Sequence, residues 1–308
     1  MSASASSPPL SAIVTRLRAA GCVFAEDEAR LLISAASTPA DLAAMVDRRA
    51  AGLPLEHVVG WAEFCGLRIA VDPGVFVPRR RSEFLVRQAA DLAHGAASPP
   101  DQALSPASQA TAGFPGQAPA RRVSASRPGR AGPPVVIVDL CCGSGALGAA
   151  LTAALGRAEL HAADVDPAAA RCARRNLAAF GGRVYEGDLY RPLPPTLRGR
   201  VDILLANVPY VPTDAVRTLP PEARLHEARL ALDGGPDGLD VLRRVAAAAP
   251  LWLAPGGHLL VETSERQALR AAQVFTLDGL AARVVSSADL NATVVIGTRP
   301  ARPACRGG

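Results

Sequence analysis

Strand and helix signals alternate from residue 135 to near the end of this chain, and this alternation limits the folds that it can adopt. Buried strands are expected at the apolar runs 135–140, 159–164, 183–188, 201–207, 258–263 and 293–298, with another near 282–286. Stretches rich in Ala, Leu and Arg separate the runs, and a capping box at Ser264 and Gln267 is expected to open one of these helices. The alternation indicates an α/β fold with a parallel, doubly wound sheet that carries helices on both faces. Ligands of such sheets bind beyond the carboxyl ends of the strands, so residues that follow a strand are the first candidates for a site.

The remaining segments differ from this pattern in composition. Near the N-terminus, Thr38 is a candidate N-cap and Pro39 the first residue of an amphipathic helix. Apolar and polar residues then alternate after Cys65, which predicts a β-hairpin. A later stretch is rich in Pro, Ala, Ser and Gly and is expected to be disordered. The expected division is a helical domain at 1–60, a linking hairpin at 61–77, an α/β domain at 78–300 with an insertion at about 95–134, and a tail at 301–308.

Lysine is absent from the chain, so its net charge of +5 comes from arginine. This absence excludes a Walker P-loop, a pyridoxal Schiff base and a lysine general base. The positive charge is modest and spread out, which favours a solvated surface over direct binding of nucleic acid. The six cysteines form no C-x-x-C pair, and the five histidines lack metal-ligand spacing, so no metal is expected. No secretory signal or membrane span is indicated, and a cytoplasmic protein is expected.

The first strand of the alternation runs into a glycine loop and a helix, in "VVIVDLCCGSGALGAAL". Gly143 and Gly145 allow close approach of the backbone to a ligand, and the helix N-terminus favours negative charge. With Gly148 they match G-x-G-x-x-G, so a dinucleotide stays possible. Asp139, four residues before Gly143, would repel a pyrophosphate but suit a cation. An adenosine cofactor with a sulfonium, such as S-adenosylmethionine, is therefore favoured.

Carboxylates end the next two strands. Asp164 is placed to accept hydrogen bonds from both hydroxyls of a ribose. Asp188 follows the third strand, where a carboxylate could accept a hydrogen bond from an adenine amino group. Both positions are consistent with either adenosine cofactor.

The fourth strand ends in Asn207-Val208-Pro209-Tyr210, here called the N-V-P-Y loop. The Asn207 side-chain oxygen and the backbone carbonyl of residue 208 would form a pair of acceptors for the two hydrogens of a planar NH2 group. Holding the group in this way directs the nitrogen lone pair at a methyl sulfonium, and Tyr210 can pack on the plane of an amide or base. Catalysis would then depend on positioning and electrostatics rather than on a strong base.

The N-V-P-Y loop resembles the N-P-P-Y of amino methyltransferases, and three longer segments resemble the protein-(glutamine-N5) methyltransferases. These segments are 48–79, 226–245, which includes "LDGGPDGL", and 253–262. The resemblance implies a class I S-adenosylmethionine-dependent methyltransferase (Rossmann-like) fold, and methylation of the Gly-Gly-Gln glutamine of peptide-chain release factors. The cofactor contacts that it implies, together with those expected above, come from Asp139, Cys141, Gly143, Gly145, Asp164, Asp188 and Asn207. Substrate contacts are expected from Asn207, Tyr210 and Glu227, and the catalytic loop is Asn207, Val208, Pro209 and Tyr210.

Several residues depart from the family pattern. Arg79 and Glu83 match the family's P-R-P-E-T-E element, but Arg80 and Arg81 stand in place of its proline and acid. Cys141 replaces a glycine of the cofactor loop, where its side chain narrows the approach of the backbone to a ligand. Val208 replaces the first proline of N-P-P-Y.

Three functions follow as hypotheses. The first is methyl transfer from S-adenosylmethionine to a glutamine amide, with the helical domain docking the protein substrate. The second is an amino methyltransferase of nucleic acid, because an exocyclic base amine presents the same planar NH2 group; only 12 Phe, Trp and Tyr residues are available for stacking, which disfavours it. The third is a binding protein that keeps the fold without turnover.

Overall fold

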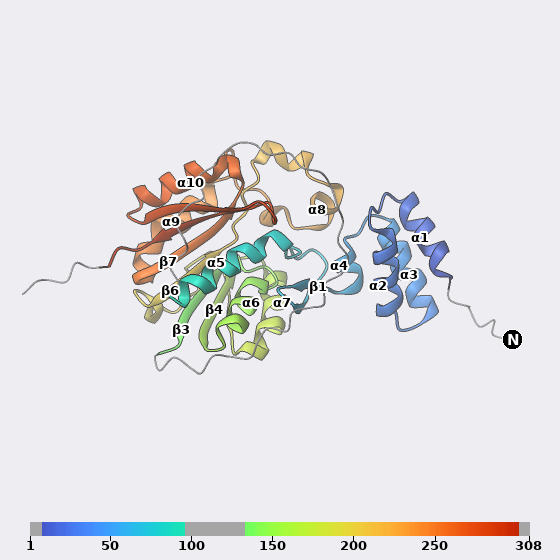
Figure 1. The fold of residues 1–308 in the computed structure, drawn as a ribbon, viewed down its shortest axis with the longest axis horizontal. Coiled ribbons are helices and arrows are strands. Elements are labelled where there is room, and N and C mark those ends of the chain that lie inside the picture. The colour runs from blue at the N-terminus through green and yellow to red at the C-terminus, as the bar shows by residue number, and fades with distance from the viewer. Residues whose placement is uncertain (1–7, 96–132, 302–308) are drawn as a thin grey trace, which may run out of the picture.

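The computed structural model describes residues 8–95 and 133–301, and Figure 1 shows a small helical unit beside a larger α/β unit. The expected insertion at about 95–134 lies almost wholly outside the described residues, as do residues 302–308 of the expected tail. No described helix is both long and apolar enough to cross a membrane.

The helical unit is formed by the first four helices, α1 (Leu10–Ala19), α2 (Ala25–Ala35), α3 (Pro39–Ala50) and α4 (Leu55–Val59). The predicted cap is confirmed, because the Thr38 hydroxyl accepts the Asp41 N–H at 3.1 Å. Apolar side chains from all four helices pack in a separate core, among them Leu17, Leu32 and Met45. The unit therefore has its own buried apolar core, as the amphipathic pattern predicts.

A hairpin of β1 (Trp61–Phe64) and β2 (Leu67–Ala70) follows, with antiparallel pairing. Ala62 of the hairpin packs with Ala169 and Cys172 of helix α7 (Pro167–Leu177), together with three valines that follow the hairpin, Val71, Val75 and Val77. The Asn176 side chain bonds both the N–H and the carbonyl of Ala70 at 2.9 Å, and it also donates to the Ser144 carbonyl at 2.8 Å. The hairpin is thus fixed to the α/β unit as well as joined to the helical unit.

The α/β unit contains a seven-stranded sheet in the order β5-β4-β3-β6-β7-β9-β8. Its strands are β3 (Val135–Leu140), β4 (Ala158–Asp164), β5 (Arg183–Glu186), β6 (Val201–Ala206), β7 (Leu253–Thr263), β8 (Ala281–Ser287) and β9 (Ala292–Thr298). The first five strands in this order are parallel, but β9 is antiparallel to both β7 and β8. The expectation of a wholly parallel sheet is therefore wrong at one strand. The turn between β8 and β9 is too short for a crossover, so the two strands must be antiparallel.

Helices cover both faces of the sheet, so the fold is the doubly wound α/β arrangement that the alternation predicts. α5 (Glu83–Ala93), α6 (Ala146–Leu155) and α7 contribute to the core on one face. α9 (Asp240–Trp252) and α10 (Glu265–Leu277) contribute to the core on the other. The described chain also has short 3-10 turns at Arg80–Ser82, Ala178–Phe180, Pro195–Leu197, Thr213–Thr218 and Arg229–Ala231.

One short helix connects the two units. α8 (Pro221–His226) lies in the segment between β6 and α9, and Figure 1 places it between the sheet and the helical unit. The buried Arg49 of α3 donates to Glu28 of α2 at 2.6 Å and to Glu222 of α8 at 2.7 Å. This charge network holds the helical unit against the segment that follows the N-V-P-Y loop.

Candidate active site

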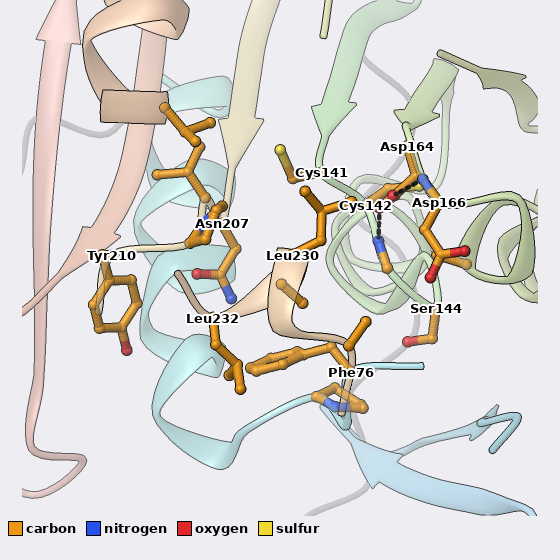
Figure 2. A pocket seen from close by; sticks show the side chains of 18 of the residues that line it. Phe76, Cys141, Cys142, Ser144, Asp164, Asp166, Asn207, Tyr210, Leu230 and Leu232 are labelled. Carbon is orange, nitrogen blue, oxygen red and sulfur yellow. Dashed lines mark hydrogen bonds between the residues drawn. The ribbon is translucent and has the colours of Figure 1, made fainter. Parts of the chain in front are cut away.

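A cavity of about 590 Å³ lies where β3, β4 and β6 end. It is lined by the cofactor loop after β3, by residues that follow β4, β5 and β6, and by parts of residues 74–82 and 219–233. Figure 2 shows Asn207 and Tyr210 on one side of this cavity and Asp164 and Ser144 on the other. The position agrees with the rule that ligands bind beyond the carboxyl ends of parallel strands.

The glycine loop has left-handed backbone at three positions, Cys141 (φ 53°), Gly143 (φ 54°) and Gly145 (φ 79°). A Cβ at Gly145 would lie 3.0 Å from the Leu177 side chain, and one at Gly148 would lie 3.0 Å from the Leu160 side chain. Two of the three glycines of the G-x-G-x-x-G spacing therefore allow close packing of α6 against its neighbours. Cys141 adopts the left-handed region although it has a side chain, which costs about 1 kcal/mol.

Asp164 and Asp188 both line the cavity, as the sequence predicts. Asp164 accepts the Gly143 N–H at 2.8 Å and the Asp166 N–H at 2.9 Å, so it fixes the glycine loop. Burial raises the pKa of the Asp164 carboxyl, and the backbone hydrogen bonds oppose that shift. Asp188 accepts from the Arg244 guanidinium at 2.6 Å.

Asp139 is placed differently from the sequence prediction. Its carboxyl is fully buried, accepts the Gly148 N–H at 3.0 Å, and does not belong to the cavity lining. Its other oxygen has no hydrogen-bond partner among the described residues. Desolvation raises the Asp139 pKa to about 7, so burial favours the protonated acid up to near neutral pH. Asp139 therefore supports helix α6 from behind the loop. The sequence spacing predicted that it would face a cationic cofactor, and this position corrects that prediction.

The N-V-P-Y loop forms the opposite wall of the cavity, and all four of its residues line it. Within the described residues, the Asn207 side-chain amide and the carbonyl of residue 208 have no recorded hydrogen-bond partner. Val208 is 1% exposed and packs in the core with Leu239 and Val261. The two acceptors that the sequence identified thus have no protein partner among the described residues, and both belong to residues that line the cavity.

Tyr210 is held through its hydroxyl group. It donates to Glu262 at 3.2 Å and accepts from Arg81, whose guanidinium also pairs with Glu262 at 2.8 Å. Burial and the Glu262 charge raise the pKa of the Tyr210 phenol, so the hydroxyl stays protonated. The ring faces, rather than the hydroxyl, are what this residue can offer to a substrate.

A second segment packs on the backbone of the N-V-P-Y loop and is here called the glycine clasp (residues 233–239). Gly234 donates to the Val211 carbonyl at 2.9 Å, and Val211 donates to the Leu232 carbonyl at 3.0 Å. A Cβ at Gly234 would lie 2.5 Å from the Pro209 carbonyl oxygen, and one at Gly238 would collide with the Tyr210 carbonyl. These two glycines are required because two backbone segments touch.

Gln267 fixes the same contact, although the sequence suggested another role for it. Its amide donates to the Tyr210 carbonyl at 3.0 Å and to the Asp237 carbonyl at 2.9 Å. The Ser264 hydroxyl bonds the Gln267 side chain and makes no bond to the helix backbone, so the capping box expected at these residues is wrong. Sequence reasoning missed Gln267, because its spacing from Ser264 is identical to that of a cap.

Glu227, expected to contact substrate, is also placed differently. It is 6% exposed and does not belong to the cavity lining. Its carboxyl accepts the Val77 N–H at 3.2 Å and pairs with Arg79 at 2.5 Å. Glu227 therefore anchors the segment after the hairpin instead of facing a substrate, which corrects the expected contact.

The donor set of the cavity fits an adenosine cofactor with a cationic centre better than a pyrophosphate. The lining cations Arg79, Arg81 and Arg244 each pair with a carboxylate. In the loop, the N–H groups of Gly143 and Gly145 are already bonded to Asp164 and to the Cys142 carbonyl. The lining carboxylates Asp164 and Asp188 can accept from hydroxyl and amino groups, whereas none of these three arginines is left unpaired for a phosphate.

Comparison with known proteins agrees with this interpretation. The family model of the methyltransferase small domain matches residues 133–238. A release factor glutamine methyltransferase of Geobacter sulfurreducens is 35% identical over 78% of this chain and 72% of its own length. One of Mycolicibacterium smegmatis is 36% identical over 90% of this chain and 86% of its own length. A 4-amino-L-phenylalanine/4-methylamino-L-phenylalanine methyltransferase of Streptomyces pristinaespiralis is 34% identical over 76% and 69%.

The matched methyltransferase domain is consistent with the sheet order of the α/β unit. The release factor glutamine methyltransferases match most of this chain and most of their own length. The chain is therefore an S-adenosylmethionine-dependent methyltransferase and belongs to the release factor glutamine methyltransferase family.

Proposed function

We propose that this enzyme methylates the side-chain nitrogen of the Gly-Gly-Gln glutamine in peptide-chain release factors. The observation that carries the proposal is the pair of unpartnered acceptors at Asn207 and at the carbonyl of residue 208, which lie in the wall of the cavity. Two acceptors side by side match the two hydrogens of a primary amide. The names of the relatives support a release factor as the protein that carries this amide.

The acceptors give the reaction its geometry. S-Adenosylmethionine, when bound, supplies an electrophilic methyl group. Asn207 Oδ1 and the carbonyl of residue 208 hold the two amide hydrogens, so the nitrogen lone pair is directed at that group. The new carbon–nitrogen bond would form as the methyl carbon–sulfur bond breaks, with the electron pair of that bond left on sulfur. The same oxygens would stabilise the positive charge on nitrogen, and a proton from the nitrogen would then pass to water. The Tyr210 ring packs on the amide plane and limits its tilt.

The relative named for 4-amino-L-phenylalanine supports the role of the acceptors. Its two named substrates bear an aryl amine and an aryl methylamine, whereas the other two relatives are named for glutamine. The shared element is a nitrogen on a planar carbon, which is the group that two adjacent acceptors can hold. In this chain, we assign that task to Asn207 and to the carbonyl of residue 208.

The cofactor contacts are part of the proposal. Gly143 and Gly145 bring the loop backbone near the ligand, Cys141 lines the same loop, and Asp164 and Asp188 accept from the ribose hydroxyls and the adenine amino group. The helical unit, tied to α8 by Arg49 and Glu222, docks the release factor beside the cavity. We also propose that the enzyme acts in the cytoplasm and that it does not bind nucleic acid directly.

Incubation of the protein with labelled S-adenosylmethionine and a purified release factor tests the proposal, with the label located by peptide mass spectrometry. We expect label on the Gly-Gly-Gln glutamine and none on a release factor in which that glutamine is replaced by alanine. RNA, DNA and 4-amino-L-phenylalanine serve as parallel acceptors. Label only on one of these would assign the enzyme to another substrate, and cofactor binding without transfer to any acceptor would indicate a binding protein.

A further inference from the structure

Arg81 occupies a place where the family element P-R-P-E-T-E has an acid, and its contacts show a defined task. It lines the cavity, and its guanidinium reaches Glu262 at 2.8 Å and the Tyr210 hydroxyl. It also lies over the Tyr210 ring, 5.8 Å from the ring centroid. One cation thus contacts both the aromatic residue of the N-V-P-Y loop and the carboxylate that shares its hydroxyl.

Glu262 gives this arrangement its rigidity. It lies in β7 and is 2% exposed, so its carboxylate cannot be solvated and depends on protein donors. It receives three of them, from Arg81 at 2.8 Å, from the Ser82 hydroxyl at 2.6 Å and from the Tyr210 hydroxyl at 3.2 Å. A buried charge with fixed partners holds each partner in one position.

The hydrogen-bonding capacity of the Tyr210 hydroxyl is used inside this network, by donation to Glu262 and by acceptance from Arg81. The ring therefore cannot swing away from this position without breaking both bonds, because the hydroxyl oxygen would move with it. Asn207, beside Tyr210 in Figure 2, has no comparable side-chain restraint within the described residues. Residues outside the N-V-P-Y loop thus hold the Tyr210 ring in position.

We propose that Arg81 is a positioning residue for methyl transfer, which together with Glu262 fixes the Tyr210 ring against the substrate amide. The inference rests on the proposed function, because the ring acts on a planar NH2 group held by Asn207. It makes a prediction that the family pattern alone does not make. Arg81→Glu, which returns the acid of that pattern, places a second carboxylate beside the buried Glu262 and damages the site.

The matched control is Arg80→Glu. Arg80 is the neighbouring departure from the pattern, undergoes the same charge reversal, is exposed, and has no recorded partner in the described parts of the chain. We expect Arg81→Glu to lower kcat about 10- to 100-fold, as for a small misplacement of reacting groups. We expect Arg80→Glu to stay within about twofold, because exposed charges contribute little. Arg81→Lys keeps the charge but loses the planar guanidinium that bonds two partners at once, so its kcat is expected to lie between those of wild type and Arg81→Glu.

A second pair of measurements separates positioning from general damage. If Arg81 acts through Glu262, the double variant Arg81→Glu with Glu262→Gln loses less kcat than Arg81→Glu alone, because the like-charge contact is removed. Fluorotyrosine labelling gives resonances for the three tyrosines of the chain, assigned by Tyr210→Phe. Arg81→Glu is expected to shift the Tyr210 resonance. The Tyr190 resonance should not move, because Tyr190 is buried elsewhere and donates to the Val245 carbonyl. Calorimetric binding of S-adenosylmethionine checks that each variant is folded.

The outcomes distinguish this inference from the proposed function. An active wild type in which Arg81→Glu keeps kcat within about twofold would overturn the inference, as would a loss of kcat with an unmoved Tyr210 resonance. Failure of the wild type to label a release factor would overturn the proposed function alone. In that case the resonance measurement, which needs no substrate, still decides whether Arg81 positions the ring.

Discussion

The contact between the glycine clasp and the N-V-P-Y loop leads to a prediction whose size can be worked from the structure. Gly234→Ala places a Cβ 2.5 Å from the Pro209 carbonyl oxygen, whereas ordinary contacts begin at 3.4 Å. The two segments must separate by the difference, about 0.9 Å. Gly234 cannot shift alone within the clasp, because the same Cβ would also lie 2.8 Å from the Gly238 carbonyl oxygen. Gln267 also bonds the Tyr210 and Asp237 carbonyls and so links the clasp to the N-V-P-Y loop. We therefore expect the separation to displace the N-V-P-Y loop.

A displacement of this size at the acceptors is expected to lower kcat about 100-fold, since misplacement by about 1 Å has that cost. Overpacking should also lower the free energy of unfolding, by about 1–3 kcal/mol. The Kd of S-adenosylmethionine should change little, because the cofactor contacts assigned to the glycine loop and to Asp164 and Asp188 lie on other segments. Label transfer to the release factor gives kcat, and denaturant unfolding and calorimetry give the other two quantities.

The control for lost stability is Gly279→Ala. Gly279 has a left-handed φ of 82° and nothing within 4 Å of an added Cβ, so the substitution strains the backbone without a collision. It should cost about 1–2 kcal/mol of stability and leave kcat unchanged. If Gly234→Ala loses comparable stability but keeps kcat within about threefold of wild type, the clasp does not set the position of the acceptors, and the reasoning is refuted.

Four further changes have definite expected outcomes. Asn207→Ala removes one of the two acceptors and should lower label transfer at least about 100-fold with the fold intact, and activity near wild type would remove Asn207 from the mechanism. Val208→Pro keeps a carbonyl at the same position, two residues beyond the end of β6, and should leave kcat equal or higher; a dead variant would show that the account of the loop is wrong. The Asp139 pKa is raised from 3.8 to about 7, so the folded state favours the protonated acid and stability is lost as pH rises between these values. Asp139→Asn should therefore raise the free energy of unfolding more at pH 8 than at pH 5, and an equal change at both would contradict the raised pKa. Arg49→Met leaves the buried Glu28 without its cation and should cost about 3–5 kcal/mol in denaturant unfolding, whereas an unchanged midpoint would mean that the charge network adds no stability.

Much of the architecture follows from the sequence because it depends on local patterns. Period-two and apolar runs locate the strands, and parallel pairing then brings the residues after β3, β4, β5 and β6 to one edge. For this reason the sequence predicts that Asp164, Asp188 and Asn207 lie at one site, and all three line the same cavity. The reversed strand β9 was not predicted, since an apolar run carries no sign of its direction.

Side-chain direction and long-range contacts account for the rest. Asp139 lies near the end of β3, where its side chain can point either toward a ligand or into the core. The sequence pattern does not say which, and the structure shows the side chain buried. Glu227 meets Arg79 across 148 residues of chain, and Gln267 meets Tyr210 across 57. Such partners depend on the folded geometry, so no local spacing could distinguish Gln267 from a helix cap.

The bonds of Asn176 determine where this enzyme could be divided into independent parts. The same side chain bonds Ala70 in the hairpin and the Ser144 carbonyl in the glycine loop, so the hairpin shares a support with the cofactor loop. A truncated protein that begins after the hairpin would lose one side of this support, along with the apolar cover of α7 by the hairpin. One that begins at Trp61 would keep both. A minimal methyl-transfer module should therefore begin before the hairpin, because the hairpin belongs structurally with the α/β unit rather than with the helical unit.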